Sequence, residues 1–314
     1  MRITNSMMIN QFLYNMNNNL GKLDKYHNQL ETGRKITRPS DDPVGVTRSL
    51  QARTDLSKLE RYTQNVGDAK AWLTQTETSL MEMNEIIKRA YDLAIDSNSG
   101  TKTPEDMASN AKELRELENQ LIQCANTTYG GRYVFGGYNT VEVPFKIETD
   151  LNGNRQLIYN GADLITGNEA VLDKLEGEAL SYEIGTGVNM KVSINGIELF
   201  GRGDNNIFSV ISGLTDALES GDAEGIDASI GKLQKAQEDI LSHLAEVGGK
   251  YNRLEMVESR YSTDKINYTA VKSSVEDVDQ AEAIMEFMMA QMVYRSSLSV
   301  GARIIQPTLV DFLS

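Results

Sequence analysis

Both ends of the chain carry large apolar residues at alternating spacings of three and four, which is the pattern of a seam between paired helices. The first stripe runs from Ile9 to Leu30, and the second runs from Ile284 to Phe312. Two matching stripes indicate a chain that folds back on itself so that its terminal helices pair. Because a thin pair of helices buries little apolar surface, we also expect neighbouring subunits to share the seam.

The stripe positions are the candidate partner-binding residues. They are Ile9, Leu13, Met16, Leu20, Leu23 and Leu30 in the first stripe, and Ile284, Phe287, Met288, Tyr294, Leu298, Ile305, Leu309 and Phe312 in the second. Asparagine is frequent in the first stripe, at Asn15 and at residues 17–19, and it is a poor residue for an isolated helix. We therefore expect termini that are mobile in the free subunit and ordered in an assembly.

Three segments read as helix starts between these ends. Asp42 before Pro43 is typical of an N-cap followed by proline at the first helical position, and it opens a long helix to about Asp96. Thr103 and Asp106 flank Pro104 as a capping box for a third helix, to about Thr128. Residues 273–276, Ser-Ser-Val-Glu, read as a capping box for the last helix.

The periodicity changes to short β-rich runs between Tyr129 and about Asn205. The runs are Arg132 to Phe135, Gln156 to Tyr159, Asn189 to Ile194 and Ile197 to Phe200, and the Asn-Gly pairs between them are at residues 152–153, 160–161 and 195–196. Asn-Gly is a strong signal for a hairpin turn. Helical periodicity returns at Ile207, with a short helix and then a long rod.

The expected fold is mainly α with a β-rich insert. Long antiparallel helical rods carry a small outer β domain, and the terminal helices pair as a coiled coil. We expect a terminal coiled-coil domain from residues 1–40 and 272–314, a helical rod domain from 41–135 and 206–271, and the β-rich insert at 136–205.

Composition argues against several classes of function. The formal net charge of −14 argues against nucleic acid, which requires clustered Lys and Arg. No window approaches the apolar length of a membrane span, and the start lacks the features of a cleaved signal peptide. The one cysteine, Cys124, lies on a helical apolar stripe and reads as a buried thiol.

Catalytic chemistry finds no support in the residue types. His27 and His243, the two histidines, are far apart in sequence, and no His/Cys spacing typical of a metal site is present. We expect no enzyme activity, no cofactor and no metal. The 13 methionines read as adaptable core fillers, or as a surface for a partner that handles the unassembled C-terminal segment.

Several stretches resemble the flagellin superfamily. They are MRITNSMM at the start, GRKITRPSDDPVG at residues 33–45, NTTYGGRYVFGGYNT at 126–140, EVGGKYNRLE at 246–255, SSVEDVDQAEAI at 273–284 and SLSVGARIIQPTLVDFLS at 297–314. YGGRYVFGGY and the final segment favour the branch of that superfamily that joins hook to filament over flagellin itself. The resemblance covers both ends and the flanks of the insert.

The resemblance implies a structural protein that assembles as a ring between the hook-side junction protein, which is the first hook-associated protein, and the flagellin filament. It implies an extracellular location after export through the flagellar type III apparatus, without a cleaved signal peptide. The implied partners are copies of the chain, the hook-side junction protein, flagellin and an export chaperone on the C-terminal helix, with no nucleic acid and no membrane. The alternatives are a filament-forming flagellin or, from a different class, a surface adhesin or wall-active protein acting through the insert.

Overall fold

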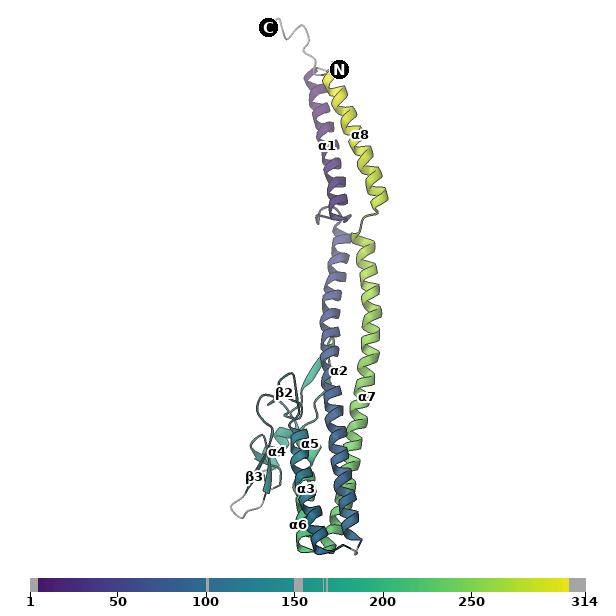
Figure 1. Cartoon of the computed structure of the whole chain (residues 1–314). Helices are drawn as coiled ribbons and strands as arrows, with labels where there is room; N and C mark the ends of the chain where they lie inside the picture. Colours follow the sequence, from purple (N-terminus) through teal and green to yellow (C-terminus); the bar gives the residue numbers. More distant parts are fainter. Residues whose placement is uncertain (1–4, 100–101, 150–154, 166, 168, 305–314) are drawn as a thin grey trace. The chain divides into compact units, whose positions relative to one another are not determined.

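The computed structural model describes residues 5–99, 102–149, 155–165, 167 and 169–304. The chain is mainly helical (Figure 1), and its residues group into two compact units. We call them the terminal unit, from residues 1–59 and 262–314, and the central unit, from residues 60–261. The division into three domains that the sequence suggests remains a prediction.

Paired terminal helices dominate the terminal unit. Helix α1 (Asn5–Thr32) packs against helix α8 (Gln280–Ile304), and the two lie side by side in Figure 1. The pairing is antiparallel: His27 near the end of α1 contacts Phe287 near the start of α8, with ring centroids 6.0 Å apart. Farther along, Asn19 Nδ2 donates to Ser297 Oγ at 3.2 Å. The folding back that the apolar stripes predicted is confirmed.

Local capping chemistry explains where the helices begin. Helix α2 (Pro43–Asn98) starts at its proline, and Asp42 Oδ1 accepts hydrogen bonds from the backbone of Val44 at 3.1 Å and Gly45 at 3.0 Å. Helix α3 (Pro104–Ala125) starts with the Thr103–Asp106 capping box. Both starts were predicted from the sequence.

The predicted cap of the last helix is wrong. Residues 273–276 form the final turn of helix α7 (Ala223–Glu276) instead of opening α8. The cap of α8 is Asp279, whose Oδ1 accepts hydrogen bonds from the backbone N–H of Ala281 at 2.9 Å and Glu282 at 3.3 Å. Ser273 instead donates a side-chain hydrogen bond to Asp277, 2.5 Å away, and so closes the end of α7.

The central unit is built on α2, α3, helix α6 (Ile207–Ser220) and α7. Helix α3 packs against α6, and α2 meets α7 through the stacked rings of Tyr62 and Tyr261, with centroids 6.3 Å apart. Apolar side chains at helical spacing form the core. They include Val66, Leu73, Leu80 and Ile87 of α2, Leu114 and Leu121 of α3, Leu214 of α6, and Leu233, Ile240 and Leu254 of α7, all fully or almost fully buried.

Short antiparallel sheets occur in the insert and just before it. Strand β1 (Thr128–Tyr129) pairs with β2 (Arg132–Tyr133), β4 (Arg155–Tyr159) lies between β3 (Phe145–Thr149) and β5 (Ala162–Asp163), and β6 (Ser181–Gly185) pairs with β7 (Val188–Lys191). Asn160 and Gly161 have φ angles of 47° and 82°, so they form the predicted two-residue turn. The predicted turn at residues 152–153 lies outside the described residues.

The insert also contains helices that the sequence did not indicate, α4 (Glu169–Glu176), α5 (Gly196–Phe200) and the 3-10 turn η1 (Gly203–Asn205). The predicted β-rich run Ile197 to Phe200 is wrong, because these residues form α5. Asn195 caps this helix: its side-chain oxygen accepts from the N–H of Ile197 at 3.1 Å, and its own backbone N–H donates to the carboxylate of Glu198 at 3.3 Å. The Asn-Gly pair at 195–196 therefore starts a helix instead of turning a hairpin.

Candidate assembly surfaces

Small side chains form part of the face of α8 that packs on α1. Ala283 and Gly301 are buried, and a Cβ atom added to Gly301 would collide with the ring of Phe12 on α1. Ala283, Ala290 and Ser297 follow each other at intervals of seven, which keeps them on one face of the helix. The helices pair through this face because small residues let the two backbones approach closely.

The predicted seam residues divide into three groups. Within the terminal unit, Ile9, Met16, Leu23, Leu30, Phe287 and Tyr294 are half-buried; Leu13, Leu20, Ile284, Met288 and Leu298 are exposed; and Ile305, Leu309 and Phe312 lie outside the described residues. The exposed five retain 40–60% of their accessible surface. The stripe thus wraps from the face between α1 and α8 onto the outer side of the pair.

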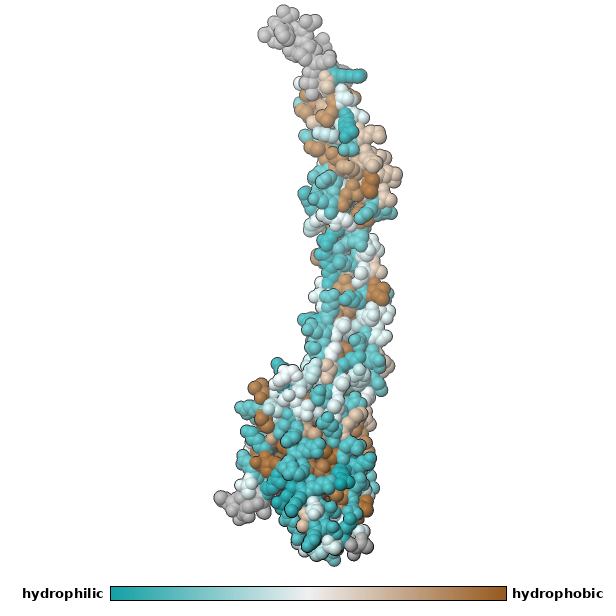
Figure 2. Space-filling view, viewed as in Figure 1, coloured by the Kyte–Doolittle hydropathy of each residue, from teal (hydrophilic) through white to brown (hydrophobic). Residues whose placement is uncertain are grey.

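The predicted seam leaves out the rest of the outward face of α8, although the sequence also suggested methionines as a surface for a partner. Met285, Met289, Met292, Val293 and Val300 are also exposed there, with no neighbour within the described chain that covers them. Hydrophobic residues, brown in Figure 2, make up much of the visible surface of α1 and α8. The seven-residue interval of Ala283, Ala290 and Ser297 was the available signal, because it marks which face turns inward and leaves the large residues outside.

The link between α1 and α2 is held against the start of α8. Lys35 donates its backbone N–H to the carbonyl of Glu276 at 2.7 Å, and Val278 donates to the carbonyl of Gly33 at 3.1 Å. Gln29 Nε2 donates to the carbonyl of Lys35 at 2.8 Å. These bonds hold the α1–α2 link against the end of α7 and the short segment that leads into α8.

A buried carboxylate fixes the same region. Glu276 accepts hydrogen bonds from Arg53 Nε at 2.6 Å and Nη2 at 2.8 Å, and from the hydroxyl of Ser49. These hydrogen bonds and the charge of Arg53 lower the pKa of the Glu276 carboxyl from its ordinary value of 4.5 to about 2. A groove of about 230 Å³ lies beside this pair, with Arg34, Arg38 and Leu50 among its lining residues.

The central unit holds a second buried ion pair. Arg155 at the start of β4 reaches Glu118 of α3, with Nη1 2.6 Å from Oε2, and its Nη2 donates to Asn119 Oδ1 at 3.0 Å. The carboxyl of Glu118 is 1% exposed, and its Oε1 has no hydrogen-bond partner among the residues that the structure describes. Burial outweighs the nearby positive charge and raises the pKa of Glu118 to about 7. This pair fastens the three-stranded sheet to the helical core.

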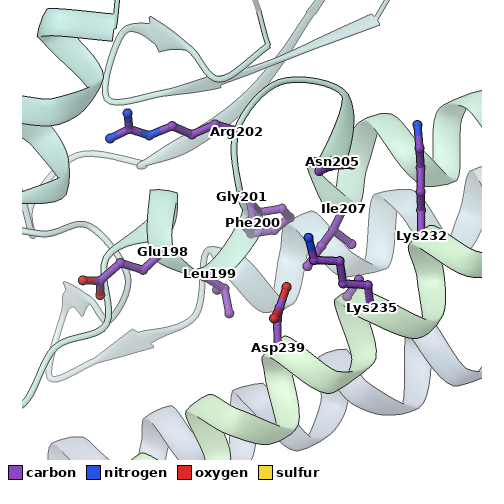
Figure 3. A pocket seen from close by; sticks show the side chains of 11 residues that line it. Glu198, Leu199, Phe200, Gly201, Arg202, Asn205, Ile207, Lys232, Lys235 and Asp239 are labelled. Carbon is purple, nitrogen blue, oxygen red and sulfur yellow. The ribbon is translucent and has the colours of Figure 1, made fainter.

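Cavities of the central unit are small and polar. One of about 240 Å³ lies between the α5–η1 segment and α7, where Lys235 and Asp239 extend toward Phe200 and Gly201 while Arg202 points away (Figure 3). Arg202 is engaged elsewhere, with its guanidinium 2.7 Å from Asp173 and in contact with Glu176.

The adjoining cavity contains His243, whose Nε2 lies 3.2 Å from the carbonyl oxygen of Glu198. Lys191 and Lys250 beside it are paired with Glu198 and Glu246, at 2.9 and 2.7 Å. The charges of this cavity are therefore balanced within the chain.

Among the described residues, no three side chains of His, Cys, Asp or Glu stand close enough together to hold a metal ion. No helix in the described part of the chain combines the length and apolar character that crossing a membrane requires.

Comparison with known proteins points to one family. The sequence model of the bacterial flagellin N-terminal helical region matches residues 3–140, and that of the bacterial flagellin C-terminal helical region matches residues 230–313. Flagellar hook-associated protein 3 of Escherichia coli (strain K12) is 26% identical over 309 residues, which are 95% of either chain. Flagellin of Bacillus subtilis (strain 168) is 24% identical over 308 residues, or 96% of either chain.

Solved structures share the fold. The flagellar hook-associated protein-3 from Legionella pneumophila aligns with a TM-score of 0.59 at 14% identity, over 72% of this chain and 98% of that one. FlgL of Bacillus cereus aligns with a TM-score of 0.55 at 20% identity, over 71% and 99%. Together the two flagellin regions cover most of the sequence and include all of α1 that the structure describes, α2, α3 and α8. The chain therefore belongs to the flagellin family of bacterial flagellar proteins.

Proposed function

We propose that this chain is a structural junction protein of the bacterial flagellum, assembled as a ring that connects the hook side to the flagellin filament. The observation that carries the proposal is the outward apolar face of the α1–α8 pair, defined by Leu13, Leu20, Ile284, Met288 and Leu298. Similarity along 95% of the chain to a flagellar hook-associated protein 3 supports the junction over other positions in the flagellum.

The inward and outward residues of α8 have different roles in the proposed assembly. The small inward residues hold this helix on α1 together with Phe287 and Tyr294, which leaves the exposed apolar side chains of the outward face free for neighbouring subunits. Each of the five exposed seam residues has roughly half of its surface left to bury, so each contributes about 1 kcal/mol when a neighbour covers it. Association through several subunits multiplies this gain and stabilises the paired termini as well, so that folding of the termini and assembly are coupled.

The partners in this proposal are copies of the chain, the hook-side junction protein, flagellin and an export chaperone that binds the C-terminal helix. The predicted seam residues Ile9, Met16, Leu23, Leu30, Phe287, Tyr294, Ile305, Leu309 and Phe312 belong to the same assembly surface in the proposal. The location is extracellular, at the hook–filament boundary, after export without a cleaved signal peptide. The role is structural, with no catalytic step and no cofactor.

Immunogold electron microscopy of intact flagella tests the position. An antibody raised against residues 142–200 recognises the insert, which is the part of the chain with little family signal. A single cluster of label at the boundary of hook and filament is the expected result. Label along the whole filament would overturn the junction role and identify the chain as a flagellin.

Charged substitutions test the surface. Leu20→Asp and Leu298→Asp each place a carboxylate on the outward apolar face, and we expect either to abolish filament attachment while the central unit stays folded. Asn18→Asp is the matched control, because it adds the same charge at an exposed position of α1 without removing an apolar side chain. Normal motility of either leucine variant would contradict the proposed surface.

Filament-forming flagellin is the second candidate, because flagellin of Bacillus subtilis matches over nearly the same length. Long tubes formed by the purified chain alone would favour it, since a junction protein does not extend indefinitely. An adhesive or wall-active insert remains the alternative from another class. Binding of the full chain to cell-wall polymers, lost on deletion of residues 142–200, would support that alternative.

A further inference from the structure

Four methionines gather on the side of α8 that faces away from α1. Met285, Met288, Met289 and Met292 are 57%, 60%, 48% and 68% exposed. Their spacing of three, four and seven residues places them on one helical face, which we call the methionine face. At 100° per residue, this face lies opposite Ala283, Ala290 and Gly301, so pairing with α1 does not cover it.

Other methionines of the chain differ in exposure. Met83 and Met190 of the central unit are 1% and 6% exposed, so they are shielded from a reagent in solution. Met7, Met8, Met81 and Met256 are exposed, but they are on other helices. The methionine face is the place where four exposed thioethers share one patch, within the described part of the chain.

We propose that the methionine face is a site of reversible oxidation by peroxide, and that oxidation of the free subunit prevents its assembly. The sulfur lone pair attacks one oxygen of hydrogen peroxide, so that an S–O bond forms as the O–O bond breaks. The leaving hydroxide takes the remaining proton and becomes water. The thioether is oxidised by two electrons to the sulfoxide, and the peroxide is reduced by two. A dithiol-dependent methionine sulfoxide reductase reverses the change, with the sulfoxide oxygen leaving as water and the dithiol becoming a disulfide.

The consequence for assembly rests on the proposed function. A sulfoxide carries a polar oxygen that needs a hydrogen-bond donor when it is buried. Around the methionine face the backbone N–H groups of α8 are already used within the helix, so a neighbouring subunit that covers the face leaves the oxygen unpaired. Because covered methionines are also shielded from peroxide, oxidation and assembly exclude each other.

The first test maps oxidation in the purified full-length chain. Hydrogen peroxide is added, and the sulfoxide at each methionine is followed by peptide mass spectrometry over time. We expect Met285, Met288, Met289 and Met292 to react at least about tenfold faster than Met83 and Met190, because solvent access limits the reaction. Equal rates at the two sets would overturn the proposal.

The second test measures assembly. The purified chain, either treated with peroxide or left untreated, is added to hooks isolated from cells that do not make this chain. The bound chain is then counted by immunogold label. We expect treatment to lower binding by about tenfold, and a methionine sulfoxide reductase with dithiothreitol to restore it. The control variant carries Met→Leu at residues 285, 288, 289 and 292, which keeps the apolar volume but removes the sulfur, and treatment should change its binding less than about twofold. An equal loss in this variant would assign the effect to other methionines and overturn the proposal.

If the proposed junction function is wrong, the untreated chain will not bind hook ends but will polymerise into filaments. Filament growth from treated and untreated chain is then compared instead of hook binding. Filaments that grow equally well from treated wild-type chain would then overturn the redox inference. Inhibition rescued by the Met→Leu variant would support it, independently of where in the flagellum the chain belongs.

Discussion

Gly301 of α8 lies against the ring of Phe12 of α1, with no room for a Cβ atom between them. This contact makes glycine the residue that sets how closely the terminal helices approach. Gly301→Ala forces the ring or the helix to shift, at a cost of about 1–3 kcal/mol from overpacking. The better helix propensity of alanine returns about 0.5–1 kcal/mol, so we expect a net loss of pairing.

Hydrogen exchange of the full-length chain measures this loss, as faster exchange of amides in α1 and α8. Gly21→Ala is the control, because a Cβ at Gly21 meets nothing within 4 Å and should slow exchange in α1. Adding Phe12→Ala to Gly301→Ala vacates the space and should recover part of the protection. Equal protection in the two single variants would contradict the close contact.

A second prediction concerns Glu276, which Arg53 and Ser49 hold ionised in the folded chain. Because its folded pKa of about 2 is below the ordinary value of 4.5, its stabilisation is fully present above pH 4.5 and is lost as the pH falls toward 2. Glu276→Gln keeps the size but removes the charge, and we expect it to destabilise the terminal unit by about 1–3 kcal/mol near pH 7.

Hydrogen exchange at the Lys35 amide, which donates to the carbonyl of Glu276, reports on this region. In the wild-type chain its protection should fall between pH 4.5 and 2 relative to the variant, after correction for the intrinsic exchange rate. Glu282→Gln is the control, since this carboxylate is exposed on the nearby start of α8. If amide protection changes with pH in the same way in the wild-type chain and in Glu276→Gln between pH 4.5 and 2, the ion pair is not the cause of the pH dependence.

Much of the helical architecture follows from local sequence. The caps at Asp42 and Thr103 depend on residues within three positions of each other, so the local sequence is enough to predict both helix starts. The turn at Asn160 and Gly161 is local in the same way. Helix α5 is different, because a run of five residues is too short for periodicity to distinguish helix from strand.

Contacts distant in sequence decide that segment. The side chain of Asn195 also donates to the carbonyl of Leu175, and Gly196 fits against the rings of Phe145 and Tyr159, where a Cβ has no space. The outward face of α8 was hidden for a related reason. Large apolar residues occur around most of that helix, so hydrophobicity alone does not reveal which side packs on α1, whereas Ala283, Ala290 and Ser297 do.

Cys124 gives a third prediction. Its thiol is buried, donates to Glu82 Oε2 at 3.5 Å, and has its pKa raised to about 11 by burial and by that carboxylate. Because the thiolate is the reactive form, alkylation by iodoacetamide at pH 7.5 should be at least about 100-fold slower in the folded chain than in urea. Rapid alkylation without denaturant would show that α3 opens readily at this position.

The last prediction concerns the buried pair of Glu118 and Arg155. The folded pKa of Glu118, about 7, is above the ordinary value of 4.5, so the folded chain holds the proton more tightly. The contribution to stability is therefore fully present below pH 4.5 and is lost as the pH rises through 7. Glu118→Gln imitates the protonated carboxyl, and we expect it to remove about 2 kcal/mol of this pH dependence.

Fluorescence of Trp72 reports on unfolding of the central unit, because Trp72 is the only tryptophan of the chain and is buried in that unit. Its ring also contacts Tyr129, with centroids 6.2 Å apart. Urea unfolding followed by Trp72 fluorescence at pH 5 and pH 8 should show the wild-type chain losing stability at the higher pH, while Glu118→Gln changes little. Glu113 lies on α3 like Glu118, and its partly exposed carboxylate pairs with Arg89 of α2. Glu113→Gln should therefore keep the wild-type pH dependence. If Glu118→Gln also keeps that dependence, another group titrates in this range and Glu118 is already ionised near neutral pH.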